Sequence, residues 1–355
     1  MRPYAFPGSQ VLLRLLLVAV LAVGAALAIQ PVPASAHPSA KTYSNNGVPV
    51  IYVHGFDPSG AIPYGCDGMP NFGTIQQFFS QHGWWGATYG VGYYNGDGRC
   101  DALLQNEAWR CTGWYAGSEG TTNEDVRHKS CELAWYIWDN FTSAGVAVKM
   151  IGHSGGGIII RQAIADTPYV GAFPPYLMVE DVVTAGTPHQ GILTSSGFWY
   201  CGGCTEVAQI EQANALMVDL NSTSFRGGFG RNPQAGSAGT DWTTMASYND
   251  SALYVGCAAA PDQFGGYLGD ENSDPSINGE YCGFMPGATH LDAYTGPTPY
   301  YDHGDYLTDT STGWDADVSY SDNNGRNWTH ACSTCTYKMT HSIQTMLYAV
   351  SYTSW

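Results

Sequence analysis

The sequence predicts an α/β protein with a mostly parallel, doubly wound sheet that is flanked by helices and carries loop insertions pinned by disulfides. Short apolar, β-branched segments alternate along the chain with segments of helical period, which is typical of a parallel sheet with crossover helices. One apolar segment, 146–151, runs directly into Gly152-His153-Ser154-Gly155-Gly156 and then into a helical segment. The ten cysteines indicate that disulfides hold the longer loops.

The predicted elements follow from apolar period and turn residues. Strands are expected at 48–54, 87–94, 146–151, 177–185, 242–247 and 290–294, with a hairpin within 308–336. Helices are expected at 74–82, from about 123 to 141, and at 158–165, 207–220 and 340–350, with Thr122 as the cap of the second. A loop rich in glycine and cysteine is expected at 95–121.

The chain divides into a leader and one large domain. Residues 1–36 combine early arginines, an apolar run and Ala34-Ser35-Ala36, the pattern of a cleaved secretory signal peptide. A flexible segment is expected at 37–46 and a single domain at 47–355. Within that domain, residues 192–240 are expected to form a cap or lid, or a surface insertion without gating, and 255–286 a loop insertion.

Charge and cysteine content restrict the partners. The formal net charge of −17 disfavours nucleic acid and anionic lipid surfaces. The signal peptide indicates a secreted protein without an integral membrane segment after cleavage, with an uncleaved membrane anchor as the alternative, and we expect a monomer. The even cysteine count behind a signal peptide indicates disulfides, and pairing of sequence neighbours is one hypothesis: Cys66–Cys100, Cys111–Cys131, Cys201–Cys204, Cys257–Cys282 and Cys332–Cys335. A zinc site made by the two Cys-x-x-Cys pairs is the alternative that secretion disfavours, so no metal and no cofactor are assigned.

Ser154 is the candidate nucleophile. A strand, then Gly-x-Ser-x-Gly, then a helix is the order that a nucleophile elbow needs, because the sharp turn lifts the serine hydroxyl clear of the sheet. Serine is a poor nucleophile at neutral pH, so it needs a base to take its proton and a third group to orient that base.

These motifs resemble the secreted bacterial lipases and esterases of the α/β-hydrolase fold. The matching segments are Val50–Phe56, Gly152–Gly156, the Gly-Thr-Pro-His-x-Gly turn at Gly186–Gly191, and the strand ending in Asn249-Asp250. The first match falls on the third strand of that fold, so the chain resembles the compact variant that lacks the first two. The resemblance spans roughly residues 47–307, with 192–240 and 255–286 unmatched.

The resemblance implies the remaining catalytic groups. The acid would be Asp250, which follows the next strand but one after the nucleophile strand, with Asp262 as the alternative. The base would be His303, with His290 and His341 as competing candidates. The backbone N–H groups of Phe56 and Gly155 would stabilise the oxyanion. His54, His153 and His189 are expected to be structural.

These assignments predict a secreted serine hydrolase of carboxylic esters, acting on a small-molecule or lipid ester through an acyl-enzyme. Two alternatives remain open. A secreted acyltransferase would use the same elbow, and a non-catalytic binding protein would use the many tyrosine and tryptophan residues to stack on sugars.

Overall fold

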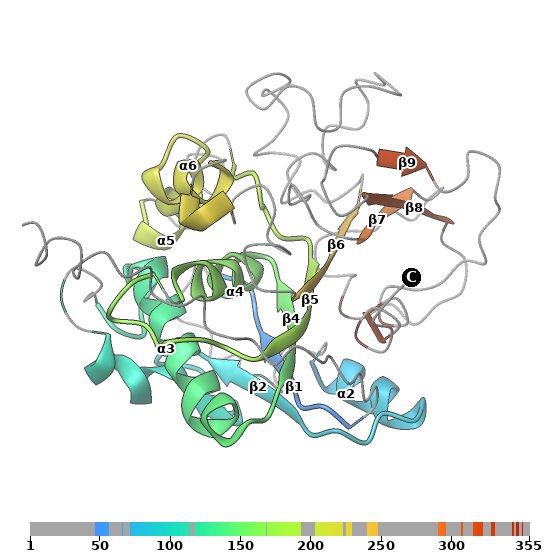
Figure 1. Ribbon diagram of the computed structural model, residues 1–355, viewed down its shortest axis with the longest axis horizontal. Coiled ribbons are helices and arrows are strands. Elements are labelled where there is room, and N and C mark those ends of the chain that lie inside the picture. The colour runs from blue at the N-terminus through green and yellow to red at the C-terminus, as the bar shows by residue number, and fades with distance from the viewer. Residues whose placement is uncertain are drawn as a thin grey trace, which may run out of the picture. The chain divides into compact units, whose positions relative to one another are not determined.

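In the part of the chain that the structure describes, nine strands form one sheet in the order β3-β2-β1-β4-β5-β6-β7-β8-β9 (Figure 1). All pairings from β3 through to β7 are parallel, whereas β8 runs antiparallel to β7 and β9 antiparallel to β8. The bounds are β1 Val50–Val53, β2 Thr88–Gly92, β3 Ala102–Leu103, β4 Val148–His153, β5 Val179–Ala185, β6 Asp241–Ser247, β7 His290–Thr295, β8 Asp315–Ser321 and β9 Trp328–His330. The predicted parallel sheet and the hairpin after residue 308 are confirmed.

The computed structural model describes part of the chain, and all described residues belong to one unit, Tyr43–Trp355. The predicted signal segment and the whole 255–286 insertion lie outside the described residues. The described residues are 47–56, 66, 72–111, 113, 118–167, 169–192, 203–222, 225–228, 240–247, 290–295, 307, 315–321, 328–330, 343, 346, 347 and 350.

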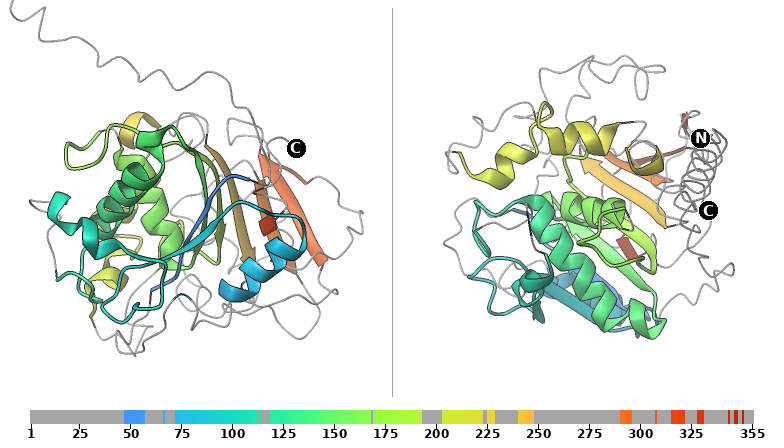
Figure 2. Two further views of the ribbon diagram at one scale, coloured as in Figure 1. Left: turned by 90° about the horizontal axis from the view of Figure 1, so that it is seen from below. Right: turned by 60° about the vertical axis from the view of Figure 1, so that its left-hand side comes forward.

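Helices cover both faces of the sheet (Figure 2). They are α2 Phe72–Gln81, α3 Val126–Asn140, α4 Gly155–Asp166, α5 Thr205–Gln209 and α6 Ala215–Asn221, with 3₁₀ helices η1 Leu104–Arg110, η2 Thr142–Ala144 and η5 Phe225–Gly228. Within the described residues, no helix is both long enough and apolar enough to cross a bilayer.

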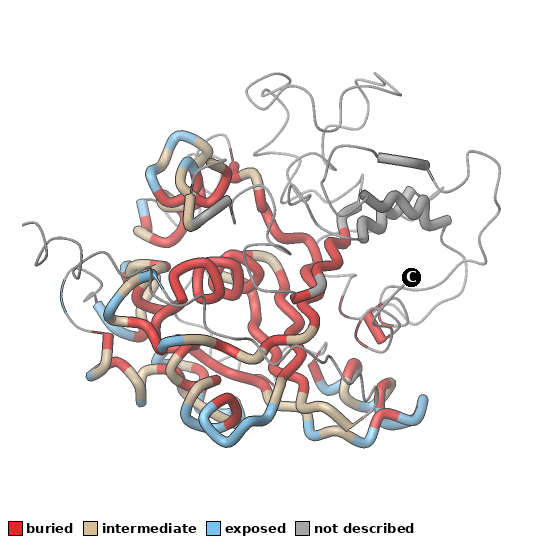
Figure 3. The backbone as a smooth tube through the Cα atoms, viewed as in Figure 1, coloured by how far each residue is buried: buried red, intermediate tan, exposed pale blue. Residues whose placement is uncertain are grey.

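The alternation of side chains along β1 assigns these helices to two faces. Ile51 and Val53 belong to the apolar cluster that contains α3 and α4, whereas Val50 and Tyr52 belong to the cluster that contains α2. Successive side chains of a strand point to opposite faces, so each face of β1 is buried under helices. Every residue of β4 and of α4 is buried (Figure 3), and the residue between them, Ser154, is partly exposed.

Some local predictions need correction. The helix predicted over 207–220 is two short helices, because Asn214 caps α6 by accepting the N–H of Leu216 at 3.0 Å. Helix α3 is capped by Asp125, which accepts the N–H of Arg127, and not by Thr122. The segment predicted as loop at 95–121 contains β3 and η1.

Two of the five predicted disulfides are confirmed. Cys66 pairs with Cys100, and Cys111 pairs with Cys131 in α3. Cys204, which caps α5, is disulfide-bonded as well. The remaining cysteines lie outside the described residues.

Candidate active site

Ser154 occupies the sharp turn between β4 and α4. β4 ends at His153 and α4 begins at Gly155, and Ser154 between them has a φ of 52° and a ψ of −131°. Arg226 is the other non-glycine residue with positive φ among the described residues. Such a conformation is costly for a residue with a Cβ and is typical of nucleophile elbows. Ser154 as a whole residue is partly exposed, whereas its neighbours His153 and Gly155 are buried.

The glycines on either side of the elbow are required for space. A Cβ on Gly156 would lie 2.3 Å from the carbonyl oxygens of Val53 and His54. A Cβ on Gly152 would lie 2.7 Å from the Cα of Gly157. A larger residue at either position would therefore force β1 or the start of α4 out of place.

The turn that follows β1 lies directly beside the nucleophile candidate. A Cβ on Gly55 would lie 2.6 Å from the Cβ of Ser154 and 3.2 Å from its Oγ, so the backbone of Gly55 contacts the serine side chain. A Cβ on Gly155 would lie 2.5 Å from the ring of Phe56. The structure thus brings together Ser154, Phe56 and Gly155, which the sequence assigned to one site.

Tyr93 holds this turn from the side of β2. Its hydroxyl lies 2.6 Å from the carbonyl oxygen of Gly55 and 2.8 Å from that of His54. The Nδ1 of His54 also lies 2.7 Å from the Gly55 oxygen. The peptide between Gly55 and Phe56 is planar, so its carbonyl and N–H point in opposite directions. Fixing the carbonyl therefore fixes the direction of the Phe56 N–H.

A buried carboxylate supports the same turn. Asp97 Oδ2 lies 2.9 Å from His54 Nε2 and accepts the N–H groups of Tyr93 and Tyr94, both at 2.8 Å. The His54 ring stacks on Tyr93 with ring centroids 4.1 Å apart. These contacts account for His54 as a structural residue. Sequence reasoning missed Tyr93 and Asp97, and the turn-like Asn95-Gly96-Asp97 was the available signal.

The end of β5 fixes the elbow from the other side. The N–H of Ser154 donates to the carbonyl of Ala185, the last residue of β5, at 2.9 Å. In the turn that follows β5, His189 is fully buried with Nε2 2.7 Å from the hydroxyl of Thr184. Burial, and secondarily the charge of Arg161, lowers the pKa of His189 well below its usual value, so the ring is neutral. Its environment is that of a structural histidine.

The described part of the 192–240 insertion is attached to the core helices by buried charges. Glu206 of α5 accepts from the ammonium of Lys129 at 2.6 Å and from the hydroxyl of Tyr94 at 2.7 Å. Arg161 of α4 donates to the carbonyl of Leu220 in α6 at 2.6 Å. Burial lowers the pKa of Arg161 to about 9 and raises that of Glu206. Gating by the rest of this insertion stays a prediction.

The other predicted catalytic groups fall outside what the structure describes. Asp250 would follow β6, the next strand but one after β4, and β6 ends at Ser247 as expected. His290 is the first residue of β7, whose backbone pairs in parallel with β6. Asp250, Asp262, His303 and His341 themselves lie outside the described residues, so the triad stays a prediction.

The topology and the elbow together define the fold. A parallel sheet carries helices on both faces, its central strand β4 ends at a strained serine, and the following helix packs against β1. The chain has an α/β-hydrolase fold.

Comparison with known proteins adds distant structural similarities. No family model and no curated protein matches the sequence. The mature lipase BlEst2 of Bacillus licheniformis is 16% identical with a TM-score of 0.34, over 59% of this chain and 71% of that one. Lipase B of Aspergillus fumigatus is 19% identical with a TM-score of 0.34, over 60% of this chain and 40% of that one. The metagenomic carboxyl esterase MGS0156 is 13% identical with a TM-score of 0.34, over 62% and 57% of the two chains.

Proposed function

We propose that the protein is a secreted hydrolase of carboxylic esters in which Ser154 is the nucleophile. The observation that carries this proposal is the position of the Ser154 side chain, at a positive-φ turn and in contact with the backbone of Gly55. We infer that this hydroxyl faces the backbone N–H groups of Phe56 and Gly155, because that is the constellation that acyl transfer needs.

The mechanism uses two chemical steps. The Oγ of Ser154 attacks the ester carbonyl carbon while His303 takes its proton and Asp250 orients the imidazole. The N–H groups of Phe56 and Gly155 stabilise the oxyanion, and its collapse releases the alcohol, which takes the proton from His303. Water then attacks the acyl-serine by the same route and releases the carboxylic acid. The likeness to lipases and esterases agrees with this chemistry but does not carry it.

Hydrolysis of p-nitrophenyl esters of increasing acyl length tests the proposal. Ser154→Ala should lose at least about 10³-fold in kcat, since the hydroxyl is the attacking group. Ser80→Ala, on the exposed side of α2, should keep wild-type activity. Full activity of Ser154→Ala would overturn the mechanism. Failure of a serine-directed fluorophosphonate to label the wild type would favour the non-catalytic alternative.

The same assay assigns the base and the acid. His303→Ala and Asp250→Asn should be inactive, whereas His290→Ala, His341→Ala and Asp262→Asn should keep activity. If one of the latter three variants loses activity while His303→Ala or Asp250→Asn, whichever tests the same role, stays active, the role belongs to the residue changed in the inactive variant. Adding a primary alcohol and analysing the products distinguishes hydrolysis from acyl transfer, because an acyltransferase would form the new ester in preference to the free acid.

A further inference from the structure

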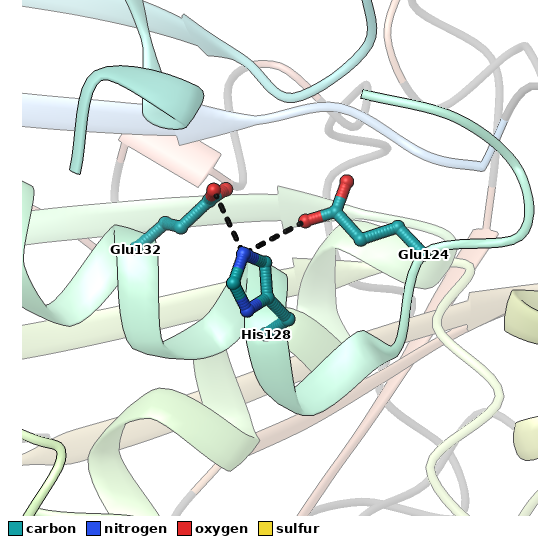
Figure 4. Close-up of side chains that lie close together, drawn as sticks. All are labelled: Glu124, His128 and Glu132. Atoms are coloured by element: carbon teal, nitrogen blue, oxygen red, sulfur yellow. Dashed lines mark ion pairs between the residues drawn. The ribbon is translucent and has the colours of Figure 1, made fainter. Parts of the chain in front are cut away.

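Three ionisable side chains lie on one face of the N-terminal part of α3. Glu124 precedes the helix, and His128 and Glu132 follow at intervals of four residues. Residues four apart in a helix lie one above the other, so the two carboxylates approach the imidazole from opposite sides (Figure 4). None of the three belongs to the site around Ser154.

The cluster is buried and compact. The exposed fractions of Glu124, His128 and Glu132 are 0%, 1% and 0%. The Nε2 of His128 lies 3.4 Å from an oxygen of Glu132 and 3.9 Å from an oxygen of Glu124. One ligand atom from each residue can be chosen so that all three lie within 4.8 Å of one another.

The polar atoms of the cluster are poorly satisfied by the protein. Among the described residues, both ring nitrogens of His128, both carboxylate oxygens of Glu132 and one of Glu124 make no hydrogen bond. The other oxygen of Glu124 accepts the N–H of Gly120 at 2.7 Å, which fixes the orientation of that carboxylate. Buried polar atoms in folded proteins nearly always have a partner, so five such atoms in one cluster indicate a missing one.

Nearby cations are already engaged elsewhere. The ammonium of Lys129 lies 2.6 Å from Glu206. The guanidinium of Arg110 lies 2.6 Å from Asp139. Within the cluster, only the imidazole of His128 can supply positive charge, and it is shared by both carboxylates. Two buried carboxylates that share a single imidazole are costly. The missing partner therefore carries positive charge and accepts both oxygen and nitrogen ligands.

We propose that Glu124, His128 and Glu132 bind one divalent transition-metal cation, with Zn²⁺ as the best fit. Two ligand atoms each about 2.1 Å from a tetrahedral ion are roughly 3.4 Å apart, the separation of His128 and Glu132 in this structure. Glu124 lies 3.9 Å from the same ring nitrogen, and its carboxylate would move toward the ion to complete the third position. Calcium is disfavoured because it takes about six to eight oxygen ligands, and imidazole is not among them.

The bound metal would have a structural role. Glu124 ends the loop that enters α3, and the disulfide from Cys111 to Cys131 ties the start of the same loop to the same helix. A metal held by Glu124 and two residues of α3 would fix the second end of this loop. Binding of the ion to the folded state alone would stabilise the domain. The sequence analysis assigned no metal ligand, and the spacing of four between these residues was the available signal.

Metal analysis of the purified full-length protein tests this inference. Refolded or expressed with Zn²⁺ and then desalted, the wild type should carry about one zinc ion per chain by plasma mass spectrometry. His128→Gln and Glu132→Gln should bind Zn²⁺ at least about tenfold more weakly, since even outer-shell changes have effects of that size. His82→Gln, an exposed histidine on the carboxyl side of α2, should bind zinc like the wild type.

X-ray absorption at the zinc edge keeps the proposal testable if a variant fails to fold. The wild type should show nitrogen and oxygen ligands at about 2.0–2.1 Å and no sulfur at about 2.3 Å, which separates this site from one made by cysteines. Zn²⁺, but not Ca²⁺, should raise the melting temperature of chelator-treated protein. A wild type without zinc after refolding in its presence, sulfur ligation, or unchanged zinc binding in His128→Gln would overturn the proposal. None of these outcomes depends on ester hydrolysis.

Discussion

The hydroxyl of Tyr93 lies 2.6 Å from the carbonyl oxygen of Gly55, and this contact sets the direction of a backbone N–H beside the nucleophile candidate. The opposite end of the same peptide is the N–H of Phe56, which the sequence predicts as an oxyanion donor. Tyr93 thereby orients the Phe56 N–H, the group that would bind the substrate oxyanion, without binding substrate itself. Such prior orientation of the donors is what makes an oxyanion hole effective.

Tyr93→Phe should lower kcat for ester hydrolysis by roughly 10-fold and leave KM nearly unchanged. Removal of one oxyanion donor typically costs about 10²–10³-fold, and loss of its support should cost less. The remaining contact from His54 Nδ1 keeps the turn in place. Steady-state kinetics on a p-nitrophenyl ester measure the effect.

Tyr89→Phe is the matched control, because Tyr89 packs against Phe141 away from the turn. Its kcat should equal that of the wild type. A Tyr93→Phe enzyme with unchanged kcat would show that the hydroxyl does not orient the Phe56 N–H. Equal losses in both variants would point to a general effect of removing a tyrosine hydroxyl.

Gly156→Ala should destabilise the fold by about 2–3 kcal/mol, because its Cβ would lie 2.3 Å from the carbonyl oxygens of Val53, which ends β1, and of His54. A Cβ added at Gly73 in α2 would have no neighbour within 4 Å. Gly73→Ala should therefore stabilise the protein by about 0.5–1 kcal/mol, because alanine has the higher helix propensity. Chemical denaturation of both variants measures the contrast. Equal effects of the two alanines would argue against a steric origin for the glycine at position 156.

The elbow could be predicted from sequence because its signals are local. The apolar run before Ser154, the two glycines and the helical period that follows are all contiguous, and each has one structural consequence. The two-residue strand β3 was missed for the opposite reason. It has too few residues to show a period, and it exists only through its pairing with Val91 and Gly92 of β2.

Support of the oxyanion turn could not be predicted from sequence. Tyr93 and Gly55 are 38 residues apart, and the acceptor is a backbone carbonyl that any residue would supply. Nothing in the identity of position 55 therefore points to position 93. Two acceptors of Arg161 are likewise backbone carbonyls, those of His189 and Leu220, and a third is the side-chain oxygen of Asn221.

Arg161→Met should loosen α6 and destabilise the domain by about 2–3 kcal/mol, because it removes charge-assisted hydrogen bonds to buried carbonyls. Limited proteolysis within 193–240 should be faster, and chemical denaturation should report the loss. Arg127→Met is the comparison, since Arg127 contacts Asp219 of the same helix at 3.7 Å, where the carboxylate is half exposed. The Arg127–Asp219 pair should contribute under about 1 kcal/mol to the free energy of unfolding. Similar proteolysis of the two variants would contradict an anchoring role for Arg161.

Lys129→Met should destabilise the protein by about 3–5 kcal/mol at pH 8, because Glu206 would remain buried without its ammonium partner. The double variant Lys129→Met/Glu206→Gln should recover much of this loss, since it leaves no uncompensated charge. Chemical denaturation of the two single variants and the double variant gives the coupling between the residues. A double variant less stable than Lys129→Met would contradict this account.

The deficit of Lys129→Met should shrink as the pH falls. Burial already raises the pKa of Glu206, with Lys129, Tyr94 and the more distant His54 opposing that rise, so removal of the ammonium raises the pKa further. Between the unfolded pKa and this raised value, the folded state binds more protons than the unfolded state, and stability therefore increases toward lower pH. Denaturation of Lys129→Met and of the double variant from pH 8 to pH 5 should show the two curves converging. Parallel curves would mean that the Glu206 carboxylate does not titrate in this range and that the loss arises from packing.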